Sequence, residues 1–478
     1  MFPLLETYLR EFRGYFTREA TFKWFVIIVI GLMQRTDHLG ITSVIRELCL
    51  DGNLYECIRN FFYSTGWSIE DIRLKWYDLV NASGLVYHVH GRTVLAGDGV
   101  KQAKEARYMP GVKKMVQESE DSSKTQFIFG HLFGAVGVIL GRHVGSLCLP
   151  LKMNIQDGLR PAASWKDSSI SAESHVLQMI ESGFEAAKSF GKSVILLDRY
   201  FLTAPALERL SKLNAAYDSE DTLLEIVSKA KANCVAYRKP EPEGHPRRGR
   251  PRKKGDTVYL RDLWKRSSLF QSAVLPIYGK DSVVRFYSCD LLWAKKLYRE
   301  LRFVLTEYNG MRSILVSTDL TLSPEEIITL YALRFKIENC FREFKQQFGG
   351  FSYHFWTKHL PKLSHFKKKT DPDPLDAVVD TDDRNLVLSK IKAIESFVLL
   401  SSIAMGLTQI ISLTPELAYE MQNGRYLRTQ PRLRASEASV AGILRKSFFA
   451  FMLRNPDSFI TRYIREKQSS VSYDSEAV

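Results

Sequence analysis

The run Ser193-Val194-Ile195-Leu196-Leu197 has the length of a strand and no charged side chain, and Asp198 follows it directly. Apolar strands of this kind are typical of the buried centre of a sheet covered by helices. A helical stretch, Ala172 to Phe190, precedes this strand, and alternating strands and helices indicate an α/β fold. Another strand, Thr93 to Gly97, also ends in an aspartate, Asp98. The sequence therefore predicts a sheet with carboxylates at two strand ends.

The rest of the chain surrounds this sheet with other patterns. Residues 1 to about 85 have apolar positions at helical spacing, and residues 240 to 310 hold short β-like pieces after a basic loop rich in Pro and Gly. We expect an α/β fold whose mixed sheet is flanked by helices and interrupted by a β-rich insertion. Helical N- and C-terminal regions complete it.

Composition limits the class of protein. The 478 residues include 67 Lys+Arg and 53 Asp+Glu, giving a net charge of +14, with 45% hydrophobic and 25% charged residues. These values exclude a disordered, collagen-like or multispan membrane protein. The excess of basic residues predicts a polyanionic partner, with nucleic acid as the first candidate. Six dispersed cysteines without a CxxC pair argue against a zinc ribbon or a disulfide scaffold.

Two apolar runs could suggest a membrane. Trp24 to Met33 is too short to span a bilayer. Ser396 to Leu413 is long enough, but it contains polar residues that include Ser401, Ser402, Thr408 and Gln409. We expect a buried helix there and no membrane association.

A helix is expected to begin at Ser323, where Ser-Pro-Glu-Glu forms a capping box. At about 100° per residue, Tyr331, Arg334, Glu338 and Lys345 fall on one face of this helix, beside an apolar stripe that packs on the core. Two interpretations remain open. The face holds a functional site, or it is the border of an ordinary amphipathic helix with an Arg334–Glu338 ion pair.

The three carboxylates of Asp98, Asp198 and Glu338 together indicate metal chemistry. Ligands of α/β sheets bind at the carboxyl ends of strands, and hard oxygen ligands suit Mg²⁺. Two Mg²⁺ ions, with Mn²⁺ able to substitute, can activate a hydroxyl on one side of a phosphodiester and stabilise the leaving oxygen on the other.

The spacing Tyr331-x2-Arg334-x3-Glu338-x6-Lys345 resembles the Tyr-Arg-Glu-Lys signature of the DDE transposases of bacterial insertion sequences. These belong to the cut-and-paste group with a β-strand insertion in a ribonuclease H-like domain. Gly97-Asp98-Gly99 and Leu197-Asp198-Arg199 are similar to the strand ends with the group's two aspartates. The order Asp, Asp, insertion, Glu also agrees, and the resemblance covers about residues 90 to 350.

The resemblance implies a transposase that binds terminal inverted repeats as a homodimer, cleaves DNA at the ends and joins the 3′-hydroxyls to target DNA. Asp98, Asp198 and Glu338 would be the catalytic metal ligands, while Tyr331, Arg334 and Lys345 would contact DNA. It also implies a cytoplasmic, nucleoid-associated bacterial protein. Relatives that form a DNA hairpin stack a flipped base on a Trp, for which Trp264 and Trp293 are the candidates here. A stand-alone nuclease and a DNA-binding protein without cleavage activity are the rival interpretations.

On this basis the chain divides into six parts. They are a helical N-terminal domain and candidate DNA-binding module (1–88), the first part of the ribonuclease H-like core (89–239), the basic β-rich insertion (240–311), the second part of the core with the Glu helix (312–365), a mobile charged loop (366–384), and a helical C-terminal region that is a candidate for dimerisation (385–478).

Two basic segments are expected to contact double-stranded DNA. The loop Arg247 to Lys254 includes Arg-Gly-Arg-Pro, which is similar to an AT-hook core. Its role is generic phosphate contact, minor-groove insertion or none; the basic residues concerned are Arg248, Arg250, Arg252, Lys253 and Lys254. Lys101 and Lys104 follow Asp98, where DNA would pass, although a surface loop is the alternative.

Other chemistry has little support in the sequence. The chain has no Walker A loop, so we expect no nucleotide cofactor. It has no Gly-x-Ser-x-Gly elbow either. His131 lies among apolar strand residues, and we expect it to be a core histidine with satisfied hydrogen bonds.

Overall fold

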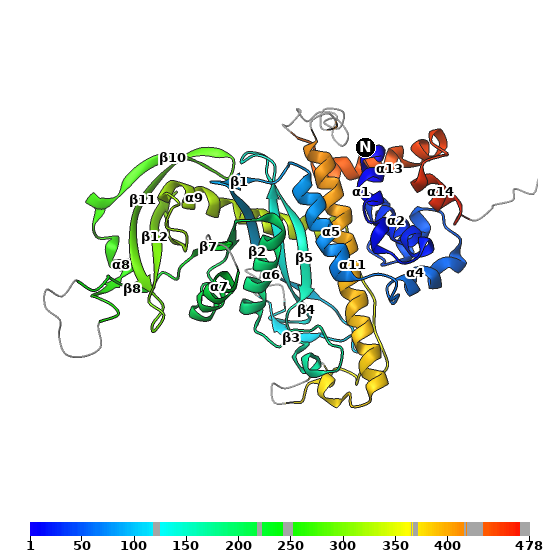
Figure 1. Cartoon of the computed structure of the whole chain (residues 1–478), viewed down its shortest axis with the longest axis horizontal. Coiled ribbons are helices and arrows are strands. Elements are labelled where there is room, and N and C mark those ends of the chain that lie inside the picture. The colour runs from blue at the N-terminus through cyan, green and yellow to red at the C-terminus, as the bar shows by residue number, and fades with distance from the viewer. Residues whose placement is uncertain are drawn as a thin grey trace, which may run out of the picture.

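The structure is a computed structural model that describes residues 1–117, 125–217, 222–241, 252–364, 366, 371–414, 417 and 434–468. Figure 1 shows an elongated molecule with a sheet across its middle, antiparallel strands at one end and a group of helices at the other. The basic loop residues Arg248 and Arg250 lie outside the described residues.

The central part of the sheet has the strand order β5-β4-β2-β6-β7. Strands β2 (Arg92–Ala103), β4 (Phe127–Leu140) and β5 (Leu147–Ile155) are antiparallel, whereas β6 (Ser193–Leu197) and β7 (Leu224–Lys229) run parallel to β2. Every residue of β6 is buried, as its apolar sequence predicts. This mixed sheet, with helices on both faces, confirms the predicted α/β class and is consistent with a ribonuclease H-like fold.

The insertion extends the same sheet beyond β7. Strand β13 (Met311–Ser317) pairs antiparallel with β7 on one side and with β12 (Arg299–Tyr308) on the other. The sheet then continues through β11 (Lys280–Trp293), with β10 (Gln271–Ile277) beside it, to β8 (Val235–Tyr237) and β9 (Thr257–Tyr259). The chain therefore returns from the insertion to the core through β13, which is antiparallel to β7. Short elements complete this half of the chain: β1 (His88–Val89), β3 (Lys113–Val116) and α8 (Leu260–Leu263).

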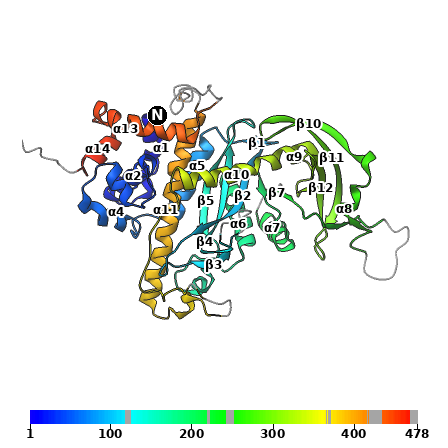
Figure 2. The ribbon, with the colours of Figure 1, turned by 180° about the vertical axis from the view of Figure 1, so that it is seen from behind.

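Helices cover the two faces of the sheet. On one face lie α6 (His175–Phe190) and α7 (Ala204–Ala216), in front of the strands in Figure 1. On the other lie α9 (Pro324–Leu333) and α10 (Phe335–Gln346), and Figure 2 shows α10 crossing the sheet near β2 and β5. Successive residues of β2 alternate between these faces.

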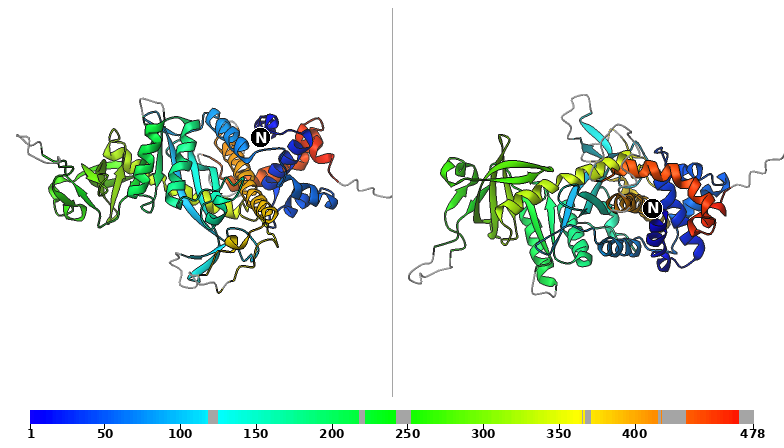
Figure 3. Two further views of the ribbon diagram at one scale, coloured as in Figure 1. Left: turned by 60° about the horizontal axis from the view of Figure 1, so that its bottom comes forward. Right: turned by 90° about the horizontal axis from the view of Figure 1, so that it is seen from above.

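The two ends of the chain form one helical region, seen at one end of the molecule in Figure 3. Helix α2 (Glu19–Gln34) packs against α11 (Thr381–Leu413), α13 (Glu437–Arg454) and α14 (Phe459–Arg465), and its segment from Phe25 to Gln34 is buried. An ion pair of 2.7 Å joins Lys23 to Glu466. The N-terminal helices are α1 (Phe2–Arg10), α3 (Thr42–Glu47), α4 (Tyr55–Phe61) and α5 (Ile69–Ala82).

Helix α11 is the one helix of the described residues that is long and apolar enough to cross a membrane, with a mean hydropathy of 1.8 over its most apolar stretch. That stretch is 94% buried inside the fold, between β5, α2 and α13. The Gln409 side chain donates to the Cys148 carbonyl at 3.1 Å. The predicted buried helix is therefore confirmed.

Candidate active site

The register of the sheet places the two aspartates side by side. In the parallel pairing of β2 with β6, Gly97 is opposite Leu197, so that Asp98 and Asp198 are the next residues on neighbouring strands. The Asp198 carbonyl accepts a hydrogen bond from the Ser228 hydroxyl of β7 at 3.2 Å. Two residues that are distant in sequence thus meet at the same end of adjacent parallel strands.

The helix with the four-residue signature is broken, and this differs from the single helix that the spacing predicts. Helix α9 begins with the predicted capping box of Ser323 and Glu326, but ends at Leu333. The Arg334 N–H then bonds to the Tyr331 carbonyl, three residues back, and α10 begins at Phe335. Arg334 keeps a helical backbone (φ −52°, ψ −36°), so the two helices remain nearly continuous at the signature.

Arg334, at the break, contacts two of the three carboxylates. Its guanidinium donates to Asp98 at 3.2 Å and also to Glu338, four residues further along. Burial by itself lowers the pKa of Arg334, but Tyr331, Asp98 and Glu338 raise it above the ordinary value. Arg334 therefore stays charged and links the first aspartate to the glutamate.

The Asp98 carboxyl group has a raised pKa. Burial raises its pKa to about 6, while Arg334 and the Gly99 N–H, which donates to Asp98 at 2.8 Å, lower it. The negative charges of Asp198 and Glu338 make smaller contributions to this raised value. Both other carboxylates are therefore close enough to act on Asp98, and the negative charge gathered around it favours a cation.

The other two signature residues lie on the same side of the sheet. Tyr331 is half-buried, and burial raises its pKa, while the charges of Arg334, Asp198 and Asp98 also act on it. Lys345, near the end of α10, donates to the Lys101 carbonyl of β2 at 3.3 Å. The Lys101 amine in turn donates to the Val116 carbonyl at 2.9 Å.

Lys104 has a different environment from the other basic residues near Asp98. Its amine donates to the carbonyls of Phe351 and Tyr353 at 2.5 and 3.0 Å and lies 3.9 Å from the Tyr353 ring centroid. Burial lowers its pKa to about 8. The Lys104 side chain thus joins β2 to the segment that follows α10.

The described part of the basic loop lies at the far end of the insertion. Arg252 and Lys253 are exposed, and the Lys254 amine lies 3.8 Å from the Tyr237 ring centroid. Arg252, Lys253 and Lys254 line a shallow pocket together with Lys296 and Tyr298.

A basic cavity of about 590 Å³ was not recognised from the sequence. It lies where β7 ends and β13 begins, next to Arg199, the residue after Asp198. The Arg312 guanidinium lies 5.0 Å from the Trp264 ring centroid. In the sequence, Arg199 is the one basic residue of this cavity that lies next to a predicted site residue. The other basic residues are distant in sequence, and antiparallel strands and α8 bring them together. The cationic residues that line the cavity are Arg199, Lys229, Arg261, Lys265 and Arg312.

Comparison with known proteins gives one match. Residues 170–356 match the family model described as a transposase DDE domain. This match supports a DDE transposase domain in that part of the chain. The match includes Asp198 and the whole signature around Glu338, whereas Asp98 lies before it. No curated protein and no solved structure matches the chain.

DDE transposases generally use divalent metal ions. The donor chemistry of the candidate site fits such ions, because carboxylate oxygens are the ligands that Mg²⁺ prefers. Within the described ranges, no three Asp, Glu, His or Cys side chains converge on one point. Arg334 bonds to both Asp98 and Glu338 instead.

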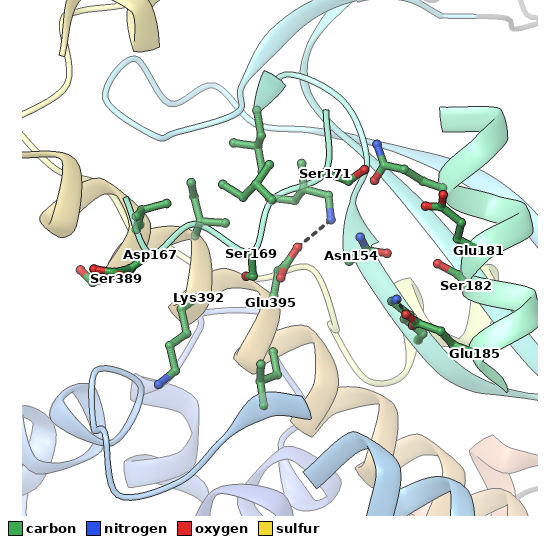
Figure 4. Close-up of a pocket in the computed structure, with 18 residues that line it drawn as sticks. Asn154, Asp167, Ser169, Ser171, Glu181, Ser182, Glu185, Ser389, Lys392 and Glu395 are labelled. Atoms are coloured by element: carbon green, nitrogen blue, oxygen red, sulfur yellow. Dashed lines mark hydrogen bonds and ion pairs between the residues drawn. The ribbon is translucent and has the colours of Figure 1, made fainter. Parts of the chain in front are cut away.

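A second cavity, of about 430 Å³, lies between β5, α6 and α11. Figure 4 shows Glu395 of α11 beside it, where the Ile155 N–H donates to its carboxylate at 3.0 Å, and Glu181 and Glu185 of α6 across the cavity. Burial raises the pKa of Glu395. This cavity lies on the α6 side of the sheet, whereas Asp98 meets Arg334 on the α10 side. It is therefore not part of the candidate active site.

The expectation for His131 is confirmed. It is fully buried, with one ring nitrogen 2.6 Å from the Tyr353 hydroxyl and the other 2.9 Å from the Pro110 carbonyl. This is the environment of a structural histidine.

Proposed function

We propose that this chain binds the terminal inverted repeats of its insertion sequence, cleaves DNA at the ends and joins the 3′-hydroxyls to target DNA. The observation that carries the proposal is the β2–β6 register, which makes Asp98 and Asp198 neighbours, with Arg334 linking Asp98 to Glu338. Together with the DDE domain match, this favours phosphoryl transfer at one composite site.

Asp98, Asp198 and Glu338 would hold two Mg²⁺ ions, or Mn²⁺ in their place. Bound there, the ions would activate the attacking oxygen and stabilise the leaving oxygen of a phosphodiester. The fold itself would position the metal ligands. The strand ends hold the two aspartates in register, and the broken helix presents Glu338 and Arg334 to them.

DNA would lie along the edge of the sheet that contains these carboxylates. Tyr331, Arg334, Lys345 and Lys101 surround the site, and the basic cavity at Arg199 extends the positive surface toward the insertion. At the far end, Arg252, Lys253 and Lys254 would contact phosphates. Lys104, with its amine held by two carbonyls, would act by joining β2 to the following segment.

The remaining features of the proposal concern assembly. Pairing two DNA ends needs at least two protomers, so we expect a homodimer in the end-paired complex. The division into a helical N-terminal DNA-binding part, a core with an insertion and a C-terminal dimerisation part also remains a proposal, as does a location with the bacterial nucleoid.

The decisive experiment is cleavage of a duplex that carries the inverted repeats flanking this gene, with Mg²⁺, by wild-type protein and Glu338→Gln. Double-strand breaks at the repeat ends by wild type alone, followed by joined products when target DNA is added, would support the proposal. Breaks without joining would indicate a nuclease. Binding without breaks by either protein would indicate a DNA-binding protein, and equal cleavage by both would exclude Glu338 from the site.

A further inference from the structure

A groove of about 390 Å³ lies away from the carboxylates, between α4, the segment 353–356 and α11. We refer to it as the aromatic groove, because rings and cationic groups make up most of its wall. The residues that define it are Tyr55, Arg59, Tyr63, Phe355, Trp356 and Lys390.

One wall of the aromatic groove alternates rings and charge. Tyr55, Arg59 and Tyr63 are four residues apart in and just after α4, a spacing that puts side chains on the same helix face. The Lys390 amine of α11 lies 4.0 Å from the Tyr63 ring centroid. Burial raises the pKa of Tyr63 to about 12, which keeps its hydroxyl neutral. The Phe355 ring meets Tyr63 edge-on at 6.1 Å.

The opposite wall presents Trp356 to solvent. Its side chain is 60% exposed, whereas the adjacent Phe355 and Thr357 are buried. The Thr357 N–H donates to the Tyr108 carbonyl at 2.9 Å, which fixes the main chain beside the indole. A large ring is thus held out over the groove on a fixed backbone, a typical arrangement for stacking on a ligand.

The charge of the groove favours an anion. Within the described part of the chain, no Asp or Glu lines it, while Arg59 and Lys390 do. Arg59 pairs with Glu56 on its own helix, and the proximity of Arg59 and burial both lower the pKa of Lys390. A bound phosphate would relieve this repulsion between the two cations.

We propose that the aromatic groove binds unpaired nucleotides of a DNA strand, with a base stacked on Trp356 and phosphates near Arg59 and Lys390. The volume is that of a site for a small ligand, which is too small for a duplex, and a duplex hides the faces of its bases. Alternating rings and cations are characteristic of single-strand sites. The choice of DNA as the partner rests on the proposed function.

The test measures the binding of a fluorescently labelled oligothymidine strand, and of the inverted-repeat duplex, by anisotropy. We expect Trp356→Ala to weaken binding of the single strand about tenfold and to leave duplex binding within about twofold. Lys390→Ala should weaken single-strand binding and reduce its salt dependence. The matched controls are Phe449→Ala and Lys446→Ala, which remove an exposed ring and an exposed cation from α13.

A second measurement distinguishes a loss of base stacking from misfolding of the variant. Trp356→Phe keeps a ring and should keep most of the affinity, but the quenching of tryptophan emission by the single strand should fall relative to wild type. Unchanged quenching, or an unchanged single-strand affinity of Trp356→Ala, would overturn the proposal. Equal loss for single strand and duplex would also overturn it, because it would indicate phosphate contact without stacking.

Failure here is distinguishable from failure of the proposed function. If wild type cleaves the repeats and Trp356→Ala binds oligothymidine normally, the groove proposal is wrong and the transposase proposal stands. If no cleavage occurs but oligothymidine binding still depends on Trp356, the groove proposal stands alone.

Discussion

Arg334 donates a hydrogen bond to the carboxylate of Asp98 across 3.2 Å, although 236 residues separate the two in sequence. The same guanidinium also bonds to Glu338. A single positive side chain thus balances two carboxylates from different elements. Its position at the break between α9 and α10 couples the geometry of the helix to that of the strand end.

Replacing Arg334 should therefore reduce both the rate of cleavage and the stability of the fold. We expect Arg334→Ala to lower the cleavage rate at least about tenfold and to cost about 1.5–3 kcal/mol of folding free energy, the usual range for hydrogen bonds to charged groups. Cleavage assays and thermal unfolding measure the two effects. Arg342→Ala is the control, because Arg342 is exposed on the same helix and pairs with Glu343. A fully active Arg334→Ala protein would contradict the prediction.

Substituting the second aspartate should separate binding from cutting. Asp198→Asn keeps the size of the side chain at the end of β6 and removes its charge. We expect cleavage to fall below detection while affinity for the repeat duplex changes by less than about threefold, because phosphate-binding cations supply most of that affinity. Gel-shift and cleavage assays on one preparation would show this. Cutting at the wild-type rate would remove Asp198 from the proposed site.

The basic cavity next to Asp198 should contribute to DNA affinity through charge. We expect Lys229→Ala and Arg312→Ala each to reduce the slope of log affinity against log salt by roughly one, the effect of one lost phosphate contact. Titrations at several salt concentrations measure this slope. Lys446→Ala, on a distant helix, provides the baseline, and a slope equal to that baseline would leave the cavity without a role in DNA binding.

Acid should destabilise the fold partly through His131. Burial lowers its pKa to about 4, compared with about 6.5 in an unfolded chain. Between these values the unfolded chain binds a proton that the folded chain does not, so the stability due to neutral His131 is complete above pH 6.5 and is lost as the pH falls toward 4. The full difference is roughly 3 kcal/mol. His131→Gln should remove it from denaturant-unfolding curves, whereas His88→Gln, at an exposed position, should not. Equal acid sensitivity of wild type and His131→Gln would refute this.

Much of the candidate site could be predicted, because the patterns that indicate it lie in short stretches of sequence. Each aspartate follows an apolar strand, and Glu338 and Arg334 share a helical spacing, so the residues could be named before their positions were known. The break at Arg334 could not be predicted, because it changes the hydrogen bonding of the main chain while Arg334 keeps helical backbone angles, and no Gly or Pro marks it. The inward position of Lys104 depends on carbonyls about 250 residues away.

The basic cavity was missed for a related reason. Arg199 follows Asp198, but Lys229, Arg261 and Arg312 meet it only through the pairing of β13 with β7. Periodicity identifies strands but does not say which strands become neighbours across an insertion. The two ends of the chain show the same limit of periodicity. The sequence predicts two separate helical regions, and the structure packs them together.

The burial of α2 by α11, α13 and α14 has a practical consequence for dissecting this protein. A fragment that stops before residue 437 would expose the part of the α2 surface that α13 and α14 cover, and one that starts after residue 34 would remove the helix on which those final helices pack. Neither end behaves as a detachable module. Studies of end recognition and of dimerisation will therefore need point substitutions in the full-length chain in place of isolated terminal fragments.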